Sequence, residues 1–198
     1  NNLSICKIKW DVMKNDLKLK YSKIIFNKKI AILRFDRDDV RNALTGTEII
    51  NDIINTVDYV NKNQNFSVLV ITGNGKSFSS GGNIKEMKKK NSPFSGTVAE
   101  IERKYRYGIQ LIPKYIEKLE IPLIAAINGP AIGAGFDLAC MCDIRIMTKQ
   151  GFLAENFINL GIIPGDGGAY FLQKIIGYQK TAELACTGRK VYAQEAFD

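Results

Sequence analysis

Three short and almost uninterrupted apolar runs constrain the fold of this chain more than any other feature. They are Val68–Ile71, Leu123–Ile127 and Ile144–Met147, and helical patterns separate them. A short continuous apolar run is typical of a buried strand in a parallel sheet that is covered on both faces. Strands that alternate with helices predict an α/β fold, in which helices cover a largely parallel sheet.

The residues before the first run predict a hairpin and a helix. Ser22–Phe26 and Ile30–Phe35 have strand character, and a tight turn at residues 27–29 joins them. Residues 45–48 (TGTE) form a capping-box pattern, which predicts the start of a helix. The apolar face of that helix is made by Ile49, Ile50, Ile53, Ile54, Val57 and Val60.

Two more helices are expected farther along the chain. Val98–Leu119 has helical periodicity, although Pro113 should kink or divide it. Phe171–Ile176 predicts a helix that ends at Gly177. Residues 192–198 begin a helical pattern and stop without a cap. We therefore expect a natural chain that continues into a further helical segment. The length suits a single domain over residues 1–198.

The absence of histidine from all 198 residues excludes several kinds of active site. A Ser-His-Asp triad, a Cys-His pair and an imidazole metal ligand are all impossible, and no metal site is expected. Any general acid or base must be Asp, Glu, Lys, Tyr or Cys. The four cysteines, Cys6, Cys140, Cys142 and Cys186, are scattered and predict reduced, buried thiols. With no signal-peptide pattern and no apolar run long enough to span a membrane, we expect a cytoplasmic protein.

Two glycine-rich segments, each after a buried strand and before an expected helix, are the strongest candidates for chemistry. They are residues 72–83 (TGNGKSFSSGGN) and residues 128–135 (NGPAIGAG). Helix N-termini present free N–H donors, so two such turns can point N–H groups at one oxygen, as in an oxyanion hole. Tight strand-to-helix turns without a ligand are the simpler alternative. Neither segment has the spacing of a P-loop or of a dinucleotide fingerprint.

Four segments, in order, resemble the crotonase (enoyl-CoA hydratase/isomerase) family. Residues 78–87 (FSSGGNIKEM) are similar to its F-x-A-G-A-D-[IL]-K-E-M motif. Residues 37–44, 127–146 and 158–168 are similar to its other signatures, and 158–168 contains a Pro-Gly-Asp-Gly turn. The resemblance implies a ββα spiral fold, assembly as trimers or dimers of trimers, and binding of acyl-CoA thioesters. The only cofactor it implies is coenzyme A as part of the substrate.

The resemblance also assigns roles to residues of this chain. Gly82 and Ala134 would supply the two oxyanion-hole amides. Residues in two segments, 41–44 and 80–85, would bind CoA. They are Arg41, Ala43, Leu44, Ser80, Gly82, Asn83, Ile84 and Lys85. The formal net charge of +8 suits an anionic ligand of this kind.

The sequence departs from the family hydratases at both catalytic glutamates. The first corresponds to Asp137, which keeps the acid on a shorter side chain, and the second corresponds to Phe157, which cannot transfer a proton. Asp166 lies in a turn from which dienoyl-CoA isomerases and 4-chlorobenzoyl-CoA dehalogenase take a working aspartate. Asp137 and Asp166 are therefore the expected proton-transfer groups, and Glu155 is a weaker candidate. For both aspartates a structural role is the alternative, at a helix N-terminus or in a turn.

These features predict an enoyl-CoA hydratase. Because the second hydratase glutamate is absent, a double-bond isomerase is the alternative. A protein that binds acyl-CoA or RNA without turnover is the alternative from another class, although no clustering of lysines among aromatic residues supports RNA. We expect Met87 and Met141 in the core, and Tyr105 and Tyr107 are candidates to line an acyl tunnel.

Overall fold

Two β-sheets form the framework of the computed structural model, which describes residues 17–90, 92 and 94–198. Cys6 and Trp10 lie outside these residues. The strands are β1 (Ser22–Asn27), β2 (Ile30–Phe35), β3 (Val68–Gly73), β4 (Leu123–Ile127), β5 (Ala131–Ile132), β6 (Ile144–Met147), β7 (Phe152–Ala154) and β8 (Lys190–Tyr192). One sheet has the order β1-β2-β3-β4-β6, and the other has the order β5-β7-β8.

The strand directions confirm the predicted α/β fold with largely parallel sheets. Strands β1 and β2 pair antiparallel as the expected hairpin, whereas β2, β3, β4 and β6 pair parallel to their neighbours. In the small sheet, β5 pairs parallel with β7, and β8 pairs antiparallel with β7. Because β3 and β4 are parallel neighbours, their carboxyl ends lie side by side. The two glycine-rich segments therefore leave the large sheet at the same end of its strands.

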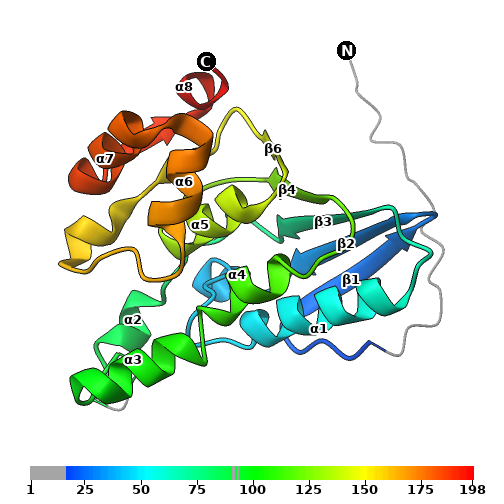
Figure 1. Cartoon of the computed structure of the whole chain (residues 1–198), viewed down its shortest axis with the longest axis horizontal. Helices are drawn as coiled ribbons and strands as arrows, with labels where there is room; N and C mark the ends of the chain where they lie inside the picture. Colours follow the sequence, from blue (N-terminus) through cyan, green and yellow to red (C-terminus); the bar gives the residue numbers. More distant parts are fainter. Residues whose placement is uncertain (1–16, 91, 93) are drawn as a thin grey trace.

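Helices cover the large sheet and flank the small one. They are α1 (Ile49–Lys62), α2 (Ile84–Met87), α3 (Val98–Arg106), α4 (Leu111–Ile116), α5 (Ala134–Met141), α6 (Gly168–Ile176), α7 (Tyr178–Thr187) and α8 (Ala193–Phe197), with 3-10 helices η1 (Asp38–Val40) and η2 (Asn156–Leu160). Helices α1 and α4 lie together against the large sheet, whereas α6 packs on α5 and α7 packs on α6 (Figure 1). No helix among the described residues is long and apolar enough to span a membrane.

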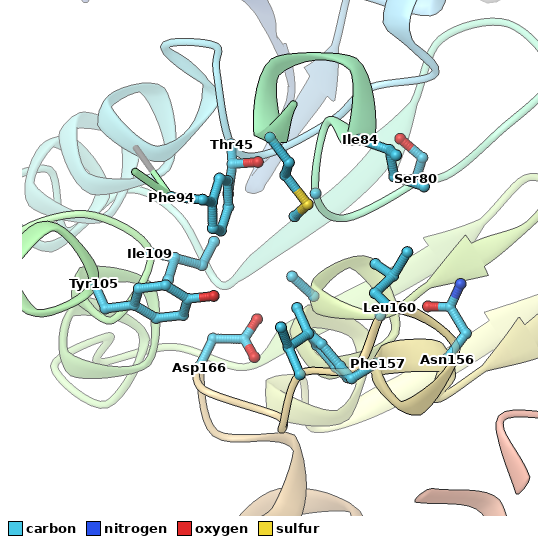
Figure 2. Close-up of a pocket in the computed structure, with 15 residues that line it drawn as sticks. Thr45, Ser80, Ile84, Phe94, Tyr105, Ile109, Asn156, Phe157, Leu160 and Asp166 are labelled. Carbon is cyan, nitrogen blue, oxygen red and sulfur yellow. The ribbon is translucent and has the colours of Figure 1, made fainter. Parts of the chain in front are cut away.

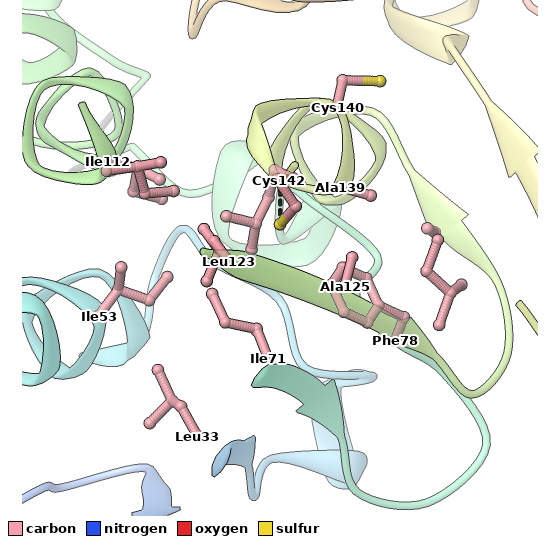
Figure 3. Close-up of a cluster of buried hydrophobic side chains, with 14 of the residues drawn as sticks. Leu33, Ile53, Ile71, Phe78, Ile112, Leu123, Ala125, Ala139, Cys140 and Cys142 are labelled. Carbon is pink, nitrogen blue, oxygen red and sulfur yellow. Dashed lines mark hydrogen bonds between the residues drawn. The ribbon is translucent and has the colours of Figure 1, made fainter. Parts of the chain in front are cut away.

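The hydrophobic core lies between the large sheet and helices α1, α4 and α5 (Figure 3). Leu33, Ile71 and Leu123 from adjacent strands face Ile53 of α1 and Ile112 of α4, and each of the five is at most 2% exposed. Along β3 and β4 only alternate residues are buried, and the others are half-buried. Cys140 and Cys142 are buried free thiols as predicted, whereas Cys186 is exposed.

Strand β6 differs from its prediction as a buried strand. It is the edge strand of the large sheet, and Ile144 and Ile146 are 51% and 62% exposed. Within the described residues, nothing buries these two side chains. An apolar run therefore identified the strand correctly but not its burial, which depends on what packs over the sheet edge.

Two helix starts also differ from the sequence prediction. At α1, Thr45 does not cap the helix. Its Oγ1 accepts the N–H of Asn83 at 3.0 Å instead. The reciprocal capping box occurs at α3, between Thr97 and Glu100. The predicted helix 98–119 is divided as expected, but at residues 107–110, because Pro113 fits in the first turn of α4.

Asn42 fixes the loop that carries the first glycine-rich segment. It is fully buried, its Oδ1 accepts the N–H of Arg37 at 2.9 Å, and its Nδ2 donates to the carbonyls of Asn74 and Ser77 at 2.9 Å each. Its φ of 54° lies in the left-handed region, which asparagine tolerates better than most residues. One side chain thus ties three parts of the chain together.

Asn42→Ala is therefore expected to destabilise the protein substantially. The substitution leaves the N–H of Arg37 and the carbonyl of Asn74 without a partner, whereas the carbonyl of Ser77 still accepts from Asn128 Nδ2 at 3.4 Å. Two lost partners cost on the order of 2 kcal/mol, or a melting temperature lower by roughly 6 °C. Thermal denaturation measures this change. Asn51→Ala, at an exposed position of α1, is the matched control and should shift stability by less than about 0.5 kcal/mol. Equal melting of the two variants would contradict the assigned role of Asn42.

Candidate active site

The two glycine-rich segments meet directly. Ile132 donates its N–H to the carbonyl of Ser79 at 3.0 Å, and Ser79 also forms a parallel bridge with Ala131. At Gly81, whose φ is 71°, a Cβ would lie 2.8 Å from the nitrogen of Ala134 and 2.4 Å from the oxygen of Ile132. Glycine is required here because the two main chains leave no room for a side chain.

Two main-chain donors at this junction have no partner. Within the described part of the chain, the N–H groups of Gly82 and Ala134 make no hydrogen bond. Ala134 is the first residue of α5, where a helix leaves its N–H groups free. Both residues line the same cavity. The expected pair of free donors is thus present beside a space that a ligand atom can enter.

The cavity is narrow and mostly apolar (Figure 2). Its volume is about 40 Å³, which is room for only a few water-sized groups. The residues that line it are Thr45, Ser80, Gly82, Ile84, Met87, Phe94, Tyr105, Ile109, Gly133, Ala134, Asn156, Phe157, Leu160, Ile162 and Asp166. Met87 therefore belongs to the cavity wall and not to the core, contrary to its prediction.

Residues 41–44, which are predicted to lie along CoA, pack against the first glycine-rich segment. Leu44 donates its N–H to the carbonyl of Gly81 at 2.7 Å, and Ser80 donates to the carbonyl of Arg41 at 2.9 Å. Arg41 is exposed, but the side chains of Ala43 and Leu44 are fully buried. These two side chains hold the turn in place, and the contact of residues 41, 43 and 44 with CoA stays a prediction.

The residues after Gly82 start the short helix α2. Asn83 caps it, because its Oδ1 accepts the N–H groups of Lys85 and Glu86 at 3.2 and 3.3 Å. Ile84 is 45% exposed and lines the cavity, and the Lys85 side chain is exposed. Their contact with CoA stays a prediction.

Three buried carboxyl groups lie beside the cavity. Asp137 in α5, Glu155 after β7 and Asp166 before α6 are 0%, 1% and 4% exposed. Asp137 lies within hydrogen-bonding reach of both others, but only Asp166 lines the cavity. Gly168 at the start of α6 leaves space for Asp137, since a Cβ at residue 168 would lie 2.1 Å from Asp137 Oδ1. The structure brings together the two aspartates predicted to transfer protons and the weaker candidate Glu155, and their roles stay predictions.

Most oxygens of the three carboxyl groups have no donor among the described residues. Within the described residues, no hydrogen-bond donor reaches either oxygen of Asp137 or Glu155, or Oδ1 of Asp166. Two carboxyl groups can share a hydrogen bond only when one of them carries a proton. Among the residues that the structure describes, no group of three metal-ligating side chains is arranged to hold a metal ion. The cluster is therefore best described as carboxyl groups that share protons.

Burial raises the pKa of all three carboxyl groups. The pKa of Asp137 is raised well above its ordinary value, first by burial and then by the charges of Asp166 and Glu155. Burial raises the pKa of Glu155 to about 7, and it also raises that of Asp166. Three adjacent charges without a cation are costly in a buried site, so the cluster keeps at least one proton near neutral pH.

Glu155→Gln should make the stability less dependent on pH. A carboxyl group with a raised native pKa stabilises the native state below its ordinary pKa of 4.5, and this contribution is lost as the pH rises through about 7. It is on the order of 3 kcal/mol. We expect the melting temperature of the wild type to fall more than that of Glu155→Gln between about pH 5 and about pH 8. Parallel pH profiles would show that Glu155 titrates normally.

Comparisons with known proteins agree with the geometry. Residues 25–198 match the profile of the family Enoyl-CoA hydratase/isomerase. A crotonyl-CoA hydratase from Syntrophomonas wolfei is 34% identical over 182 residues, which are 90% of this chain and 67% of that protein. The crystal structure of an enoyl-CoA hydratase from Bacillus anthracis superposes with a TM-score of 0.80 at 30% identity, covering 89% of this chain and 66% of that one.

A further solved structure carries a ligand. It is a Thermobifida fusca protein in complex with acetoacetyl-CoA, with a TM-score of 0.78 at 29% identity, and the match covers 89% of this chain and 70% of that one. The chain spans about three fifths of the length of the curated relatives it matches.

Proposed function

Because the chain belongs to the enoyl-CoA hydratase/isomerase family and has its crotonase fold, we propose that it acts on an acyl-CoA thioester by stabilising the enolate. The observation that carries the proposal is the pair of unpartnered N–H groups, of Gly82 and Ala134, on the wall of one cavity that also contains a carboxyl group. No separate cofactor is needed, since coenzyme A arrives with the substrate.

The chemistry follows from the charge that develops on the thioester oxygen. When a proton leaves the α-carbon, or a nucleophile adds to the β-carbon, negative charge accumulates on the carbonyl oxygen. Two fixed N–H donors at that oxygen stabilise the charge, and each is worth about 3 kcal/mol in comparable sites. Asp166 is the carboxyl group in position to move the proton.

The reaction we propose is the hydration of a 2-enoyl-CoA. Ionised Asp166 accepts a proton from water while the hydroxyl oxygen bonds to the β-carbon and the double-bond electrons shift to the thioester oxygen. The enolate then collapses, and Asp166 returns the proton to the α-carbon. One carboxyl group suffices, because Asp166 is ionised again at the end of the cycle. Asp137 and Glu155 hold the remaining proton of the cluster behind it.

Isomerisation of the double bond is the second candidate, and Phe157 is the observation that favours it. Phe157 lines the cavity at the position of the second hydratase glutamate and cannot activate water. An isomerase needs one base, which removes a proton from one carbon of the enolate system and returns it to another. Asp166 alone meets that requirement.

Three assays with the purified chain distinguish these functions. Exchange of the α-protons of butyryl-CoA with deuterated water reports enolate formation in either case. Loss of the enoyl absorbance of crotonyl-CoA reports hydration, and a gain of conjugation from a 3-enoyl-CoA reports isomerisation. Saturable binding of acyl-CoA without any of the three would favour a protein that binds without turnover, and the absence of both binding and turnover would contradict the proposal.

Assembly and location are part of the proposal. The exposed apolar residues of β6 and the family membership support self-association as a trimer or a dimer of trimers. Sedimentation measures the oligomeric state directly. We propose that the protein acts in the cytoplasm and without a nucleic-acid partner.

A further inference from the structure

A wall of four side chains separates the cavity from a larger groove. Thr45, Phe94, Tyr105 and Ile109 line both spaces. The groove has a volume of about 670 Å³, compared with about 40 Å³ for the cavity. The volume available to a ligand thus changes abruptly at this wall.

Packing on several sides holds Tyr105 in the wall. Its ring meets that of Phe94 edge-on, with centroids 5.8 Å apart and planes at 82°. On another side it touches Gly165, where a Cβ would lie 2.7 Å from Tyr105 Cε1. Figure 2 shows its hydroxyl pointing toward Asp166, and burial together with the charge of Asp166 raises the pKa of Tyr105. The ring is therefore a fixed, uncharged part of the wall at neutral pH.

The position of the wall matches the far end of the proposed substrate. Figure 2 shows Ser80 and Ile84 on one side of the cavity and Phe94, Tyr105 and Ile109 on the other. A thioester that enters past Ser80 and Ile84 would direct its acyl chain toward the wall. Beyond the wall, Ile50 and Tyr107 give the groove apolar surface that suits an alkyl chain.

We propose that Tyr105, packed on Phe94, sets the acyl-chain length that this protein accepts. With the ring present, the cavity takes short acyl groups only. Removing the ring joins the cavity to the groove, where a longer alkyl chain can lie against Ile50. This inference rests on the proposed function, because it assumes that the acyl group of a CoA thioester occupies the cavity.

The test compares short and long substrates in matched variants. The value of kcat/KM is measured for crotonyl-CoA and for octenoyl-CoA with the wild type, Tyr105→Ala and Tyr105→Phe. We expect Tyr105→Ala to raise the ratio of octenoyl-CoA to crotonyl-CoA at least about tenfold, or about 1.4 kcal/mol in selectivity. Tyr105→Phe keeps the ring and should leave the ratio within about twofold. Adding Asn51→Trp to Tyr105→Ala fills the groove from α1 and should restore the preference for the short chain.

Two results would overturn the proposal. One is a wild type that accepts both chain lengths equally, and the other is an unchanged ratio in Tyr105→Ala that still melts cooperatively. Calorimetry with butyryl-CoA and octanoyl-CoA measures the affinities of the same variants. The ratio of the two affinities gives the preference for a long or a short acyl chain without turnover. A wild type that binds both ligands but converts neither enoyl-CoA refutes the proposed reaction, while the affinity ratio still decides the role of Tyr105.

Discussion

Asp166→Asn should lower kcat at least about a hundredfold with little change in acyl-CoA affinity, because it removes the one carboxyl group that the described residues place on the cavity wall. Asparagine has nearly the same shape and can still bond to Asp137, but it cannot accept a proton at the reacting carbon. Among the described residues, no second carboxyl group lines the cavity to replace it. Stopped-flow or steady-state assays with crotonyl-CoA, and calorimetry with butyryl-CoA, separate kcat from binding.

The comparison needs controls for charge and for the buried cluster. Asp58→Asn, at an exposed position of α1, changes the same charge far from the cavity and should leave kcat unchanged within about twofold. Asp137→Asn is expected to lower kcat about tenfold and to move the pH profile, because Asp137 acts through Asp166. If Asp166→Asn keeps wild-type kcat, proton transfer does not use this carboxyl group.

The glycine turns illustrate what the sequence predicts well. A short apolar run followed by glycine-rich residues and a helical pattern identifies a strand, a turn and a helix start from local information alone. Parallel pairing of β3 and β4 then brings the two turns to one edge of the sheet. The free N–H groups of Gly82 and Ala134 follow from that arrangement, since helix starts and tight turns leave donors unpaired.

The walls of the cavity could not be predicted in the same way. Which carboxyl group faces the cavity depends on how α5 and α6 pack, and no periodicity distinguishes Asp166 from Asp137 or from the buried Glu155. Thr45 and Met87 reach the cavity from segments that looked like a helix cap and a core position. Likewise, the pattern of β6 gives no sign that Ile144 and Ile146 lie on an exposed edge.

Phe157 and the carboxyl cluster together suggest how a departure from the hydratase pattern can be accommodated. Phe157 contributes no acid to the cavity, while Asp137, Glu155 and Asp166 form a buried group of three acids of which Asp166 lines the cavity. Burial raises the pKa values of all three groups, that of Glu155 to about 7, so the cluster can hold and release a proton without a histidine.

Ala134→Pro is expected to lower kcat by about a hundredfold to a thousandfold, which corresponds to the loss of one oxyanion donor. Proline lacks the N–H that would bond to the thioester oxygen, yet it is well accepted at the first position of a helix. Ala134 occupies that position in α5, and Gly133 before it carries no Cβ to clash with the proline ring. The substitution therefore removes the donor without breaking the helix. Because the main chain of Gly81 lies close to the nitrogen of Ala134, the melting temperature is measured together with kcat.

Ala134→Gly is the matched control, because it keeps the N–H and removes only a methyl group, from a residue that is 6% exposed. It should retain kcat within about threefold, and both variants should melt cooperatively and bind butyryl-CoA. Exchange of the α-protons of butyryl-CoA should slow in Ala134→Pro by the same factor as kcat, since both reactions pass through the enolate. A folded Ala134→Pro that exchanges these protons as fast as Ala134→Gly would show that this N–H does not stabilise the enolate oxygen, and of the proposed pair only the N–H of Gly82 would remain as a donor.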